Sequence, residues 1–218
     1  MSQQHRTLGA QGTNPAHRRK RLTAAQRRER FLDVACELIV DAGLSAVTME
    51  RVARQSGVSR ALAYGYFDNS DELLAAVFER EVGAIDQLIF ARLDHIRDPR
   101  ERLKVVIEAV TEVFQGKGVL LGRLFQSHHH GEALEAARNR RANFVEDFFA
   151  QQMQKDLDIP IAEARIAASI WQTAFVGALS LCYSGKAPTA EVLAVYTRMA
   201  DAGVRALIPD SGLRESHP

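Results

Sequence analysis

Apolar residues recur along this chain every three or four positions, which is the spacing of one face of an α-helix. The periodicity predicts nine helices, and glycines or prolines lie at many of their ends. They span about residues 24–42, 48–55, 59–66, 69–98, 100–115, 120–125, 132–157, 160–183 and 189–207. No segment shows the period-two alternation of a half-buried strand. The sequence therefore predicts an all-α fold.

Composition shifts divide the chain into four parts. Residues 1–22 contain few apolar side chains and are expected to form a disordered basic arm. Residues 23–70 hold the first three helices, residues 71–208 hold the others, and residues 209–218 form a tail that is also expected to be disordered. Within the long third part, Gly116 and Gly118 are expected to separate the fifth helix from the sixth.

Residues 48–67 have the pattern of a helix-turn-helix, two short helices joined by a glycine-containing turn. Gly57 gives the turn a backbone conformation that other residues resist. Thr48 and Ser59 are placed to cap the two helices, because their hydroxyls can accept hydrogen bonds from the first turn. The outer face of the second helix then carries Arg60, Ala61 and Tyr64.

Residues 23–78 resemble the DNA-binding domain of TetR-family transcriptional repressors. The matching positions are Thr23, Arg27, Phe31, Ala35, Leu38 and Gly43, then Thr48, Gly57, Val58, Ser59, Arg60, Ala61, Tyr64, Tyr66 and Phe67, and finally Asp71, Glu72, Leu73 and Leu74. The resemblance implies an N-terminal helix-turn-helix domain that reads double-stranded DNA, followed by a helical domain for ligand binding and dimerisation.

The resemblance also implies roles for the outer face of the helix-turn-helix. Arg60 is expected to contact a base edge, and the small Ala61 permits close approach to the groove. The residues expected to position the protein on phosphates are Thr48, Ser59, Tyr64 and Tyr66. Packing in the core against Phe67 is the alternative for both tyrosines.

Three positions depart from the family pattern. Gly65 stands where the family often has a tyrosine or a polar residue that touches phosphate, and Ser70 replaces a common lysine. Ala63 is a smaller residue than the usual buried aliphatic of the recognition helix. Gly65 also lowers helix propensity by roughly 1 kcal/mol. The contacts of the motif with phosphate are therefore expected to be weak, although Gly65 keeps a DNA-facing position.

Charge is distributed unevenly along the chain. The formal net charge of the 218 residues is only +1, but residues 1–30 carry eight basic side chains and one acidic one, a net charge of +7 that leaves −6 for the rest. A basic arm beside a mildly acidic body is typical of nucleic-acid binding, with a solvated terminus as the alternative. We hypothesise that the arm compensates for the weak motif by placing Arg18, Arg19, Lys20 and Arg21 on the DNA backbone or in the minor groove.

The second domain is expected, from the resemblance, to enclose a pocket and to form a homodimer through its last two helices. A two-fold dimer would present two recognition helices to a palindromic operator. The pocket candidates are Phe114, Leu121, Phe125, His128, Phe144, Phe148, Trp171, Gln172 and Phe175. Their aromatic character suggests a small hydrophobic or aromatic effector, while ordinary core packing is the alternative.

The sequence offers little support for other chemistries. The two cysteines, Cys36 and Cys182, are too few for a disulfide scaffold or a cysteine-based zinc finger. Three consecutive histidines, His128 to His130, would point about 100° apart on a helix and would not converge on one metal ion. No nucleophile, base and acid occur at an informative spacing. We expect neither an enzyme nor a bound metal or cofactor.

The most membrane-like stretch is residues 167–183, which lies at the lower limit of a spanning length. Its polar residues and charged flanks favour a buried helix of a helical core over a membrane span. The first apolar run is broken by acidic residues, so no secretory signal is expected. These features predict a cytoplasmic protein without a membrane partner.

Together these features predict a ligand-responsive transcriptional regulator, most simply a repressor that a small effector releases from its operator. Two other classes stay open. One is an architectural helical DNA-binding protein without ligand control, and the other is an enzyme on a helical scaffold. Activation instead of repression also stays open, because the sign of regulation depends on where the operator lies.

Overall fold

The computed structural model describes residues 22–93, 95–96, 98–126 and 131–207. Over these residues it contains helices and no strand, which confirms the predicted all-α fold. The helices are α1 (Ala24–Ala42), α2 (Met49–Gln55), α3 (Arg60–Tyr64), α4 (Ser70–Leu93), α5 (Pro99–Gln126), α6 (Glu132–Leu157), α7 (Ile161–Ser184) and α8 (Thr189–Leu207), with a short 3-10 turn at Leu44–Ala46.

Local signals set the ends of α1 and the turn between α2 and α3. Thr23 and Gln26 form a capping box, in which each side chain accepts a hydrogen bond from the other's backbone N–H, at 3.2 and 3.0 Å. Gly43 ends α1 with a φ of +87°, and Gly57 has a φ of +69° in the turn. Residues with a Cβ rarely adopt such angles, so both glycines are required where they stand.

The core of α1–α3 is shared with the first half of α4. Phe31 and Val52 are fully buried, and the ring of Phe31 meets that of Phe67 edge-on, with centroids 6.3 Å apart. The same cluster continues through α4 as far as Val82 and takes in Leu124 of α5. The helix-turn-helix is therefore packed directly on the helices of the second domain.

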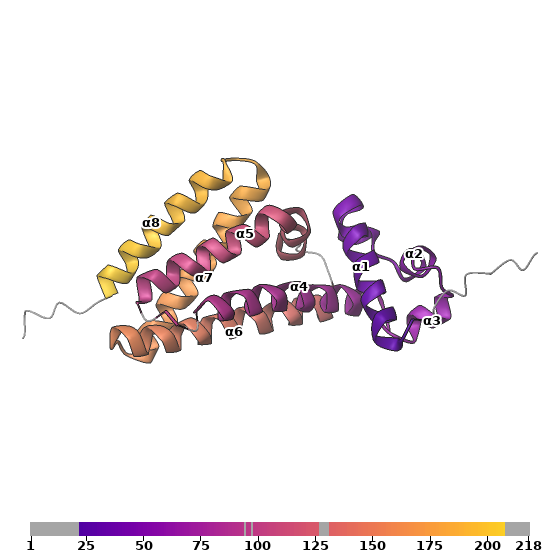
Figure 1. Cartoon of the computed structure of the whole chain (residues 1–218), viewed down its shortest axis with the longest axis horizontal. Helices are drawn as coiled ribbons and strands as arrows, with labels where there is room; N and C mark the ends of the chain where they lie inside the picture. The colour runs from indigo at the N-terminus through magenta and orange to yellow at the C-terminus, as the bar shows by residue number, and fades with distance from the viewer. Residues whose placement is uncertain (1–21, 94, 97, 127–130, 208–218) are drawn as a thin grey trace, which may run out of the picture.

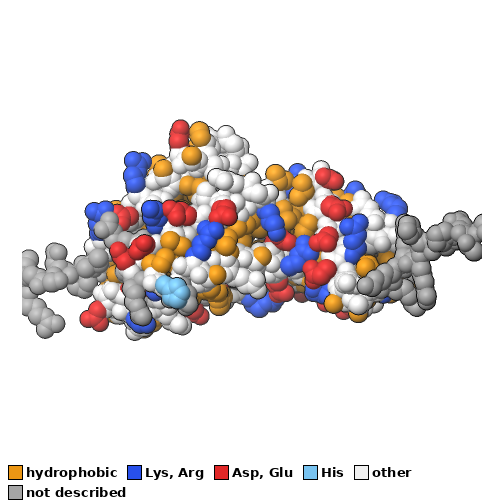
Figure 2. Space-filling view, viewed as in Figure 1, with side chains coloured by type: hydrophobic (Ala, Val, Ile, Leu, Met, Phe, Trp, Pro, Cys, Tyr) orange, Lys and Arg blue, Asp and Glu red, His pale blue; other side chains and the backbone are white. Residues whose placement is uncertain are grey.

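The second domain is built around the parallel pair α4 and α6, which lie side by side along the molecule (Figure 1). Helices α5 and α7 pack on this pair, α8 packs on α5 and α7, and α4 alone runs from the helix-turn-helix into the body (Figure 1). On the face drawn in Figure 2, Lys and Arg side chains are interspersed with Asp and Glu. That face therefore has no extended area of one charge.

The predicted count of nine helices is wrong for the described residues, because the expected fifth and sixth helices form one helix, α5. Gly116 and Gly118 produce a kink instead of a break, and Lys117 between them has non-helical angles, φ −120° and ψ 17°. The helix resumes because Leu120 and Leu124 beyond the kink are buried in the core. The fourth helix is shorter than predicted and ends at Leu93.

Close packing of α5 against α7 depends on a second glycine position. A Cβ built on Gly122 would lie 2.8 Å from two ring carbons of Tyr183 on α7. The same ring lies 5.5 Å from the ring of Phe114, measured between centroids. The absence of a side chain at Gly122 therefore lets α7 approach α5 beyond the kink.

Candidate nucleic-acid interface and internal cavity

The recognition helix α3 presents one face to solvent and buries the other. Ala63 is buried in the core, whereas the next residue, Tyr64, is 39% exposed. The other exposed residues of this surface are Ser59, Arg60, Ala61 and Gly65. The structure thus places five of the predicted DNA-facing positions on one exposed surface, and their contact with DNA stays a prediction.

Thr48 and Ser59 cap their helices as predicted. The Thr48 hydroxyl accepts from the backbone N–H of Arg51, and the Ser59 hydroxyl accepts from that of Leu62, each at 3.3 Å. Each hydroxyl hydrogen is still free to donate, since a hydroxyl both donates and accepts. The caps therefore fix the starts of α2 and α3 while leaving one donor each for a phosphate oxygen.

Arg60 is held in place by two neighbours. Its Nη1 lies 2.6 Å from Glu50 Oε1 on α2, and its Nη2 donates to the Tyr64 hydroxyl at 3.3 Å. The guanidinium also lies over the Tyr64 ring, 5.4 Å from its centroid. The hydrogen bond to Tyr64 and the charge of Glu50 raise the pKa of Arg60. Sequence reasoning missed Glu50, because this contact depends on the angle between two helices.

Tyr66 has a different environment from Tyr64. Its ring packs edge-on against Phe31 with centroids 5.3 Å apart, and its hydroxyl accepts from Arg27 Nη1 at 3.5 Å. This is close to the core-packing alternative, although the ring partner nearest to it is Phe31 and not the expected Phe67. Arg18, Arg19, Lys20 and Arg21 lie outside the described residues.

A second site is a cavity of about 200 Å³ inside the helical body. Residues from all five helices α4–α8 line it, and most of them are apolar. Seven of the nine predicted pocket residues are among the lining: Phe114, Phe125, Phe144, Phe148, Trp171, Gln172 and Phe175. Their contact with a ligand stays a prediction.

The other two predicted pocket residues do not line the cavity. Leu121 is fully buried in the apolar cluster of α4 and α5 that also contains Ile85 and Val110, so its side chain packs within the protein core. His128 lies outside the described residues. No group of three potential metal ligands occurs within the part of the chain that the structure describes.

Sequence reasoning missed the charged groups of the cavity wall. Arg141 Nη2 lies 2.5 Å from Asp86 Oδ1, and Arg102 Nη1 lies 3.6 Å from Asp156 Oδ2, and all four side chains line the cavity. One signal was present in the sequence. Arg141 precedes Phe144 and Phe148 at helical spacing, so it shares their face of α6.

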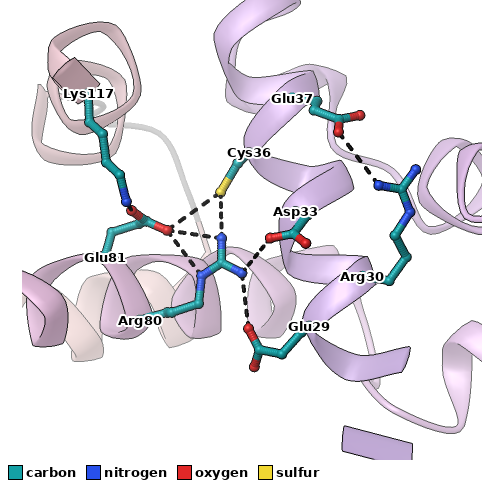
Figure 3. Close-up of polar contacts among 8 residues, drawn as sticks. All are labelled: Glu29, Arg30, Asp33, Cys36, Glu37, Arg80, Glu81 and Lys117. Atoms are coloured by element: carbon teal, nitrogen blue, oxygen red, sulfur yellow. Dashed lines mark hydrogen bonds and ion pairs between the residues drawn. The ribbon is translucent and has the colours of Figure 1, made fainter. Parts of the chain in front are cut away.

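A polar cluster lies between the helix-turn-helix and the body (Figure 3). Arg80 on α4 donates from Nη1 to Asp33 Oδ1 at 2.8 Å and to Glu29 Oε2 at 3.1 Å, both on α1. Its Nη2 donates to Cys36 Sγ at 3.2 Å. Burial alone would lower the pKa of Arg80, but the hydrogen bonds to Asp33 and Glu29 and the contact with Cys36 outweigh it and raise that pKa.

The same cluster reaches the kink of α5 through Glu81. This carboxylate is only 4% exposed, accepts from Arg80 Nε at 3.0 Å and lies 2.6 Å from Lys117 Nζ (Figure 3). Arg123, further along α5, donates to the carbonyl oxygens of Ile39 and Val40 at the end of α1. The position of α1 is therefore tied to α4 and to the kinked part of α5.

Helix α7 carries more apolar surface than its own chain covers. It is long and apolar enough to cross a membrane by length and composition, and 22% of its most apolar window is buried within the chain. Ile166 and Ile170, one turn apart, are 63% and 60% exposed, and Met199 on the neighbouring α8 is 66% exposed. The rest of the described chain therefore leaves these apolar side chains of α7 and α8 exposed.

Comparison with known proteins agrees with the fold and the motif. Residues 31–77 match the family model of bacterial regulatory proteins, tetR family. The chain is 38% identical over 81 residues to the HTH-type transcriptional regulator BetI of Rhizobium meliloti (strain 1021), covering 37% of this chain and 40% of BetI. It is 30% identical over 121 residues to the HTH-type transcriptional activator FasR of Mycolicibacterium smegmatis, covering 56% of this chain and 55% of FasR. The chain thus spans about half the length, or less, of these curated relatives.

Solved structures share the fold at low identity. A TetR-family regulator from Syntrophomonas wolfei superposes with a TM-score of 0.72 at 14% identity, over 84% of this chain and 97% of that one. A regulator from Saccharomonospora viridis in complex with choline superposes with a TM-score of 0.66 at 17% identity, over 83% of this chain and 96% of that one. AibR in complex with isovaleryl coenzyme A and operator DNA superposes with a TM-score of 0.56 at 22% identity, over 79% of this chain and 97% of that one. The chain therefore carries the helix-turn-helix region of the tetR family of bacterial regulatory proteins, and the helical body behind it has the fold of these solved regulators.

Proposed function

We propose that this protein is a sequence-specific DNA-binding transcriptional regulator, and specifically a repressor that a small hydrophobic ligand releases from a palindromic operator. The observation that carries the proposal is that α4 connects an exposed recognition surface, centred on Arg60, with an apolar cavity. An architectural protein needs the first of these features and has no use for the second, so that alternative is not favoured.

The two named complexes among the structural neighbours support both halves of the proposal. AibR was solved with isovaleryl coenzyme A and operator DNA, and the S. viridis regulator with choline. The proposed function is binding throughout and includes no catalytic step. Repression is preferred over activation as the simpler outcome of operator occupancy, although FasR is named an activator.

The working form is proposed to be a cytoplasmic homodimer that pairs through α7 and α8. The exposed apolar side chains of these helices support this interface, since Ile166 and Ile170 lie one turn apart on α7, as do Val195 and Met199 on α8. Pairing with a second copy would bury this face without a membrane. A two-fold dimer would also place two α3 helices for a palindromic site.

Coupling between the two sites is proposed to pass through the cluster of Arg80, Glu81 and Lys117. Ligand binding shifts a population only if the ligand contacts differ between two conformations. A change in the cavity wall of α5 would alter the kink at Lys117, and Arg80 would pass that change to α1. The helix-turn-helix would then take an orientation that no longer matches the operator.

The test is footprinting on the DNA that flanks the protein's own gene, repeated with a panel of hydrophobic compounds. The expected result is a protected palindrome that at least one compound releases. Arg60→Ala should abolish specific protection while the dimer stays intact by sedimentation. Arg92→Ala, which removes an arginine of α4 paired with Glu112, is the matched control and should leave the footprint unchanged. A footprint without sequence preference would contradict the proposal.

A further inference from the structure

The cavity wall is apolar apart from a few polar groups whose placement is informative. The charged and amide side chains among them come from four helices: Asp86 from α4, Arg102 from α5, Arg141, Gln152 and Asp156 from α6, and Gln172 from α7. A purely hydrocarbon ligand makes no use of these groups, and charges within an apolar wall are costly unless they are paired. The polar groups therefore carry information about the head group of the ligand.

Arg141 is the polar group with the most unused capacity. Its one ion pair joins Nη2 to Asp86 Oδ1, and its Nε and Nη1 have no hydrogen-bond acceptor in the described ranges of the chain. A guanidinium has five N–H donors in a planar fork that matches the two oxygens of a carboxylate. Most of these donors remain available at the cavity wall.

The Arg141 guanidinium already supplies a positive charge next to Asp86 at the cavity wall. The Arg141 guanidinium contacts Asp86 and lies over the ring of Phe144, 5.6 Å from its centroid. A cationic ligand would have to displace the guanidinium from both partners and leave it buried without a counter-charge. An anionic ligand needs only the unused N–H groups, so the two kinds of head group are not equivalent here.

Burial disfavours the charged forms of both Asp86 and Arg141, so the ion pair between them is only partly compensated. Burial raises the pKa of Asp86 against the opposing effect of Arg141. Burial likewise lowers the pKa of Arg141, against the opposing effect of Asp86. A second carboxylate close to Arg141 would relieve the incomplete compensation of the guanidinium.

We propose that the effector is a compact acidic amphiphile, whose carboxylate binds the Arg141 guanidinium and whose apolar chain or ring lies along the aromatic wall. This proposal rests on the proposed function, because it treats the cavity as the effector site. The aromatic wall is formed by Phe90, Phe148, Trp171 and Phe175. A cavity of about 200 Å³ is small beside the roughly 300–1,000 Å³ of common ligand sites, which favours a short chain.

The structure supplies its own reporter for a binding experiment. Trp171 is the only tryptophan of the chain and lines the cavity. Its fluorescence can be followed while the full-length protein is titrated with three probes that share one tail: sodium decanoate, decan-1-ol and decyltrimethylammonium. Because only the head group differs, the ranking of the three dissociation constants shows whether the cavity prefers an anionic, a neutral or a cationic head group.

Decanoate is expected to bind at least tenfold more tightly than decan-1-ol, and decyltrimethylammonium is expected to bind least. The double variant Asp86→Asn with Arg141→Gln removes both charges together and should weaken decanoate binding by roughly ten- to a hundredfold, the usual effect of losing a charge-assisted hydrogen bond. Arg140→Gln is the matched control. Arg140 is the neighbour of Arg141 in the sequence but pairs with Glu79 away from the cavity, so this substitution should leave decanoate binding unchanged.

The single variant Asp86→Asn distinguishes an anionic from a cationic head group, because the two should change their affinity in opposite directions. It should keep or strengthen decanoate binding, because it removes the competing carboxylate. Tightest binding of decyltrimethylammonium, with its loss in Asp86→Asn, would overturn the proposal in favour of a cationic effector. Equal binding of all three probes, or no decanoate binding at millimolar concentration, would overturn it too. The titration contains no DNA, so its failure leaves the footprint as a separate test of the proposed function.

Discussion

The carboxylate of Glu81 lies 2.6 Å from the ammonium of Lys117, and Lys117 is the residue at which the backbone of α5 leaves helical geometry. Glu81 is almost fully buried and follows Arg80, whose guanidinium bonds to α1. One ion pair thus lies between the kink in a cavity-lining helix and α1, the first helix of the helix-turn-helix domain.

Lys117→Ala should destabilise the protein by about 1–2 kcal/mol. The substitution removes one partner of a buried carboxylate, but the loss is limited because Arg80 still bonds to Glu81 and the lysine is half exposed. Urea denaturation followed by circular dichroism measures the change. Lys104→Ala is the control, since it removes a solvent-exposed pair with Glu108 and should change stability by less than about 0.5 kcal/mol. Equal losses in the two variants would contradict this view of the cluster.

Gly122→Ala should destabilise the protein by about 1–3 kcal/mol, the usual cost of overpacking. The new methyl group would lie 2.8 Å from the ring of Tyr183, so α5 and α7 would have to move apart. Gly83→Ala on α4 is the matched control, because a Cβ there meets nothing within 4 Å. Replacing that helical glycine should stabilise the protein by up to about 1 kcal/mol. Thermal unfolding of both variants distinguishes the two outcomes by sign.

Cys36 should react slowly with alkylating reagents in the folded protein. Burial raises the pKa of its thiol to about 11, with Arg80 opposing that shift and Glu81 adding to it. A thiol of that pKa is only about 0.1% thiolate at pH 8, whereas an ordinary cysteine with a pKa near 8.5 is about a quarter thiolate. The measurement is the rate of iodoacetamide labelling in a Cys182→Ser variant, folded and in urea. The folded rate should be at least a hundredfold lower and should rise with pH up to about 11; equal rates would contradict the buried environment.

Deletion of residues 1–21 should weaken operator binding and reduce its dependence on salt. Each lost contact with a phosphate is expected to lower the slope of log affinity against log salt concentration by roughly 0.9. Operator affinity measured between 50 and 200 mM salt tests this role of the basic arm. A truncated protein with unchanged affinity and slope would show that Arg18, Arg19, Lys20 and Arg21 take no part in binding.

The sequence by itself determined the features that depend on short-range interactions. The capping hydroxyls of Thr48 and Ser59 and the left-handed glycines Gly43 and Gly57 act within one helical turn of their own position, and all four are found as expected. The exposed face of α3 follows equally from helical periodicity once the buried Ala63 is known. For this reason the all-α class and the helix-turn-helix could be predicted without a structure.

Only the tertiary structure decided the features that depend on distant parts of the chain. Asp86 and Arg141 are more than fifty residues apart, and they meet because α4 and α6 run side by side. The sequence could not predict that α5 continues through Lys117, because the two glycines beside Lys117 favour a break. The buried contacts beyond the kink offset the free-energy cost of keeping these glycines in a helix. Leu121 was expected at the cavity and lies in the core, because it packs into the apolar cluster that α4 and α5 form together. Helical periodicity tells which residues share a face, whereas packing determines what that face meets.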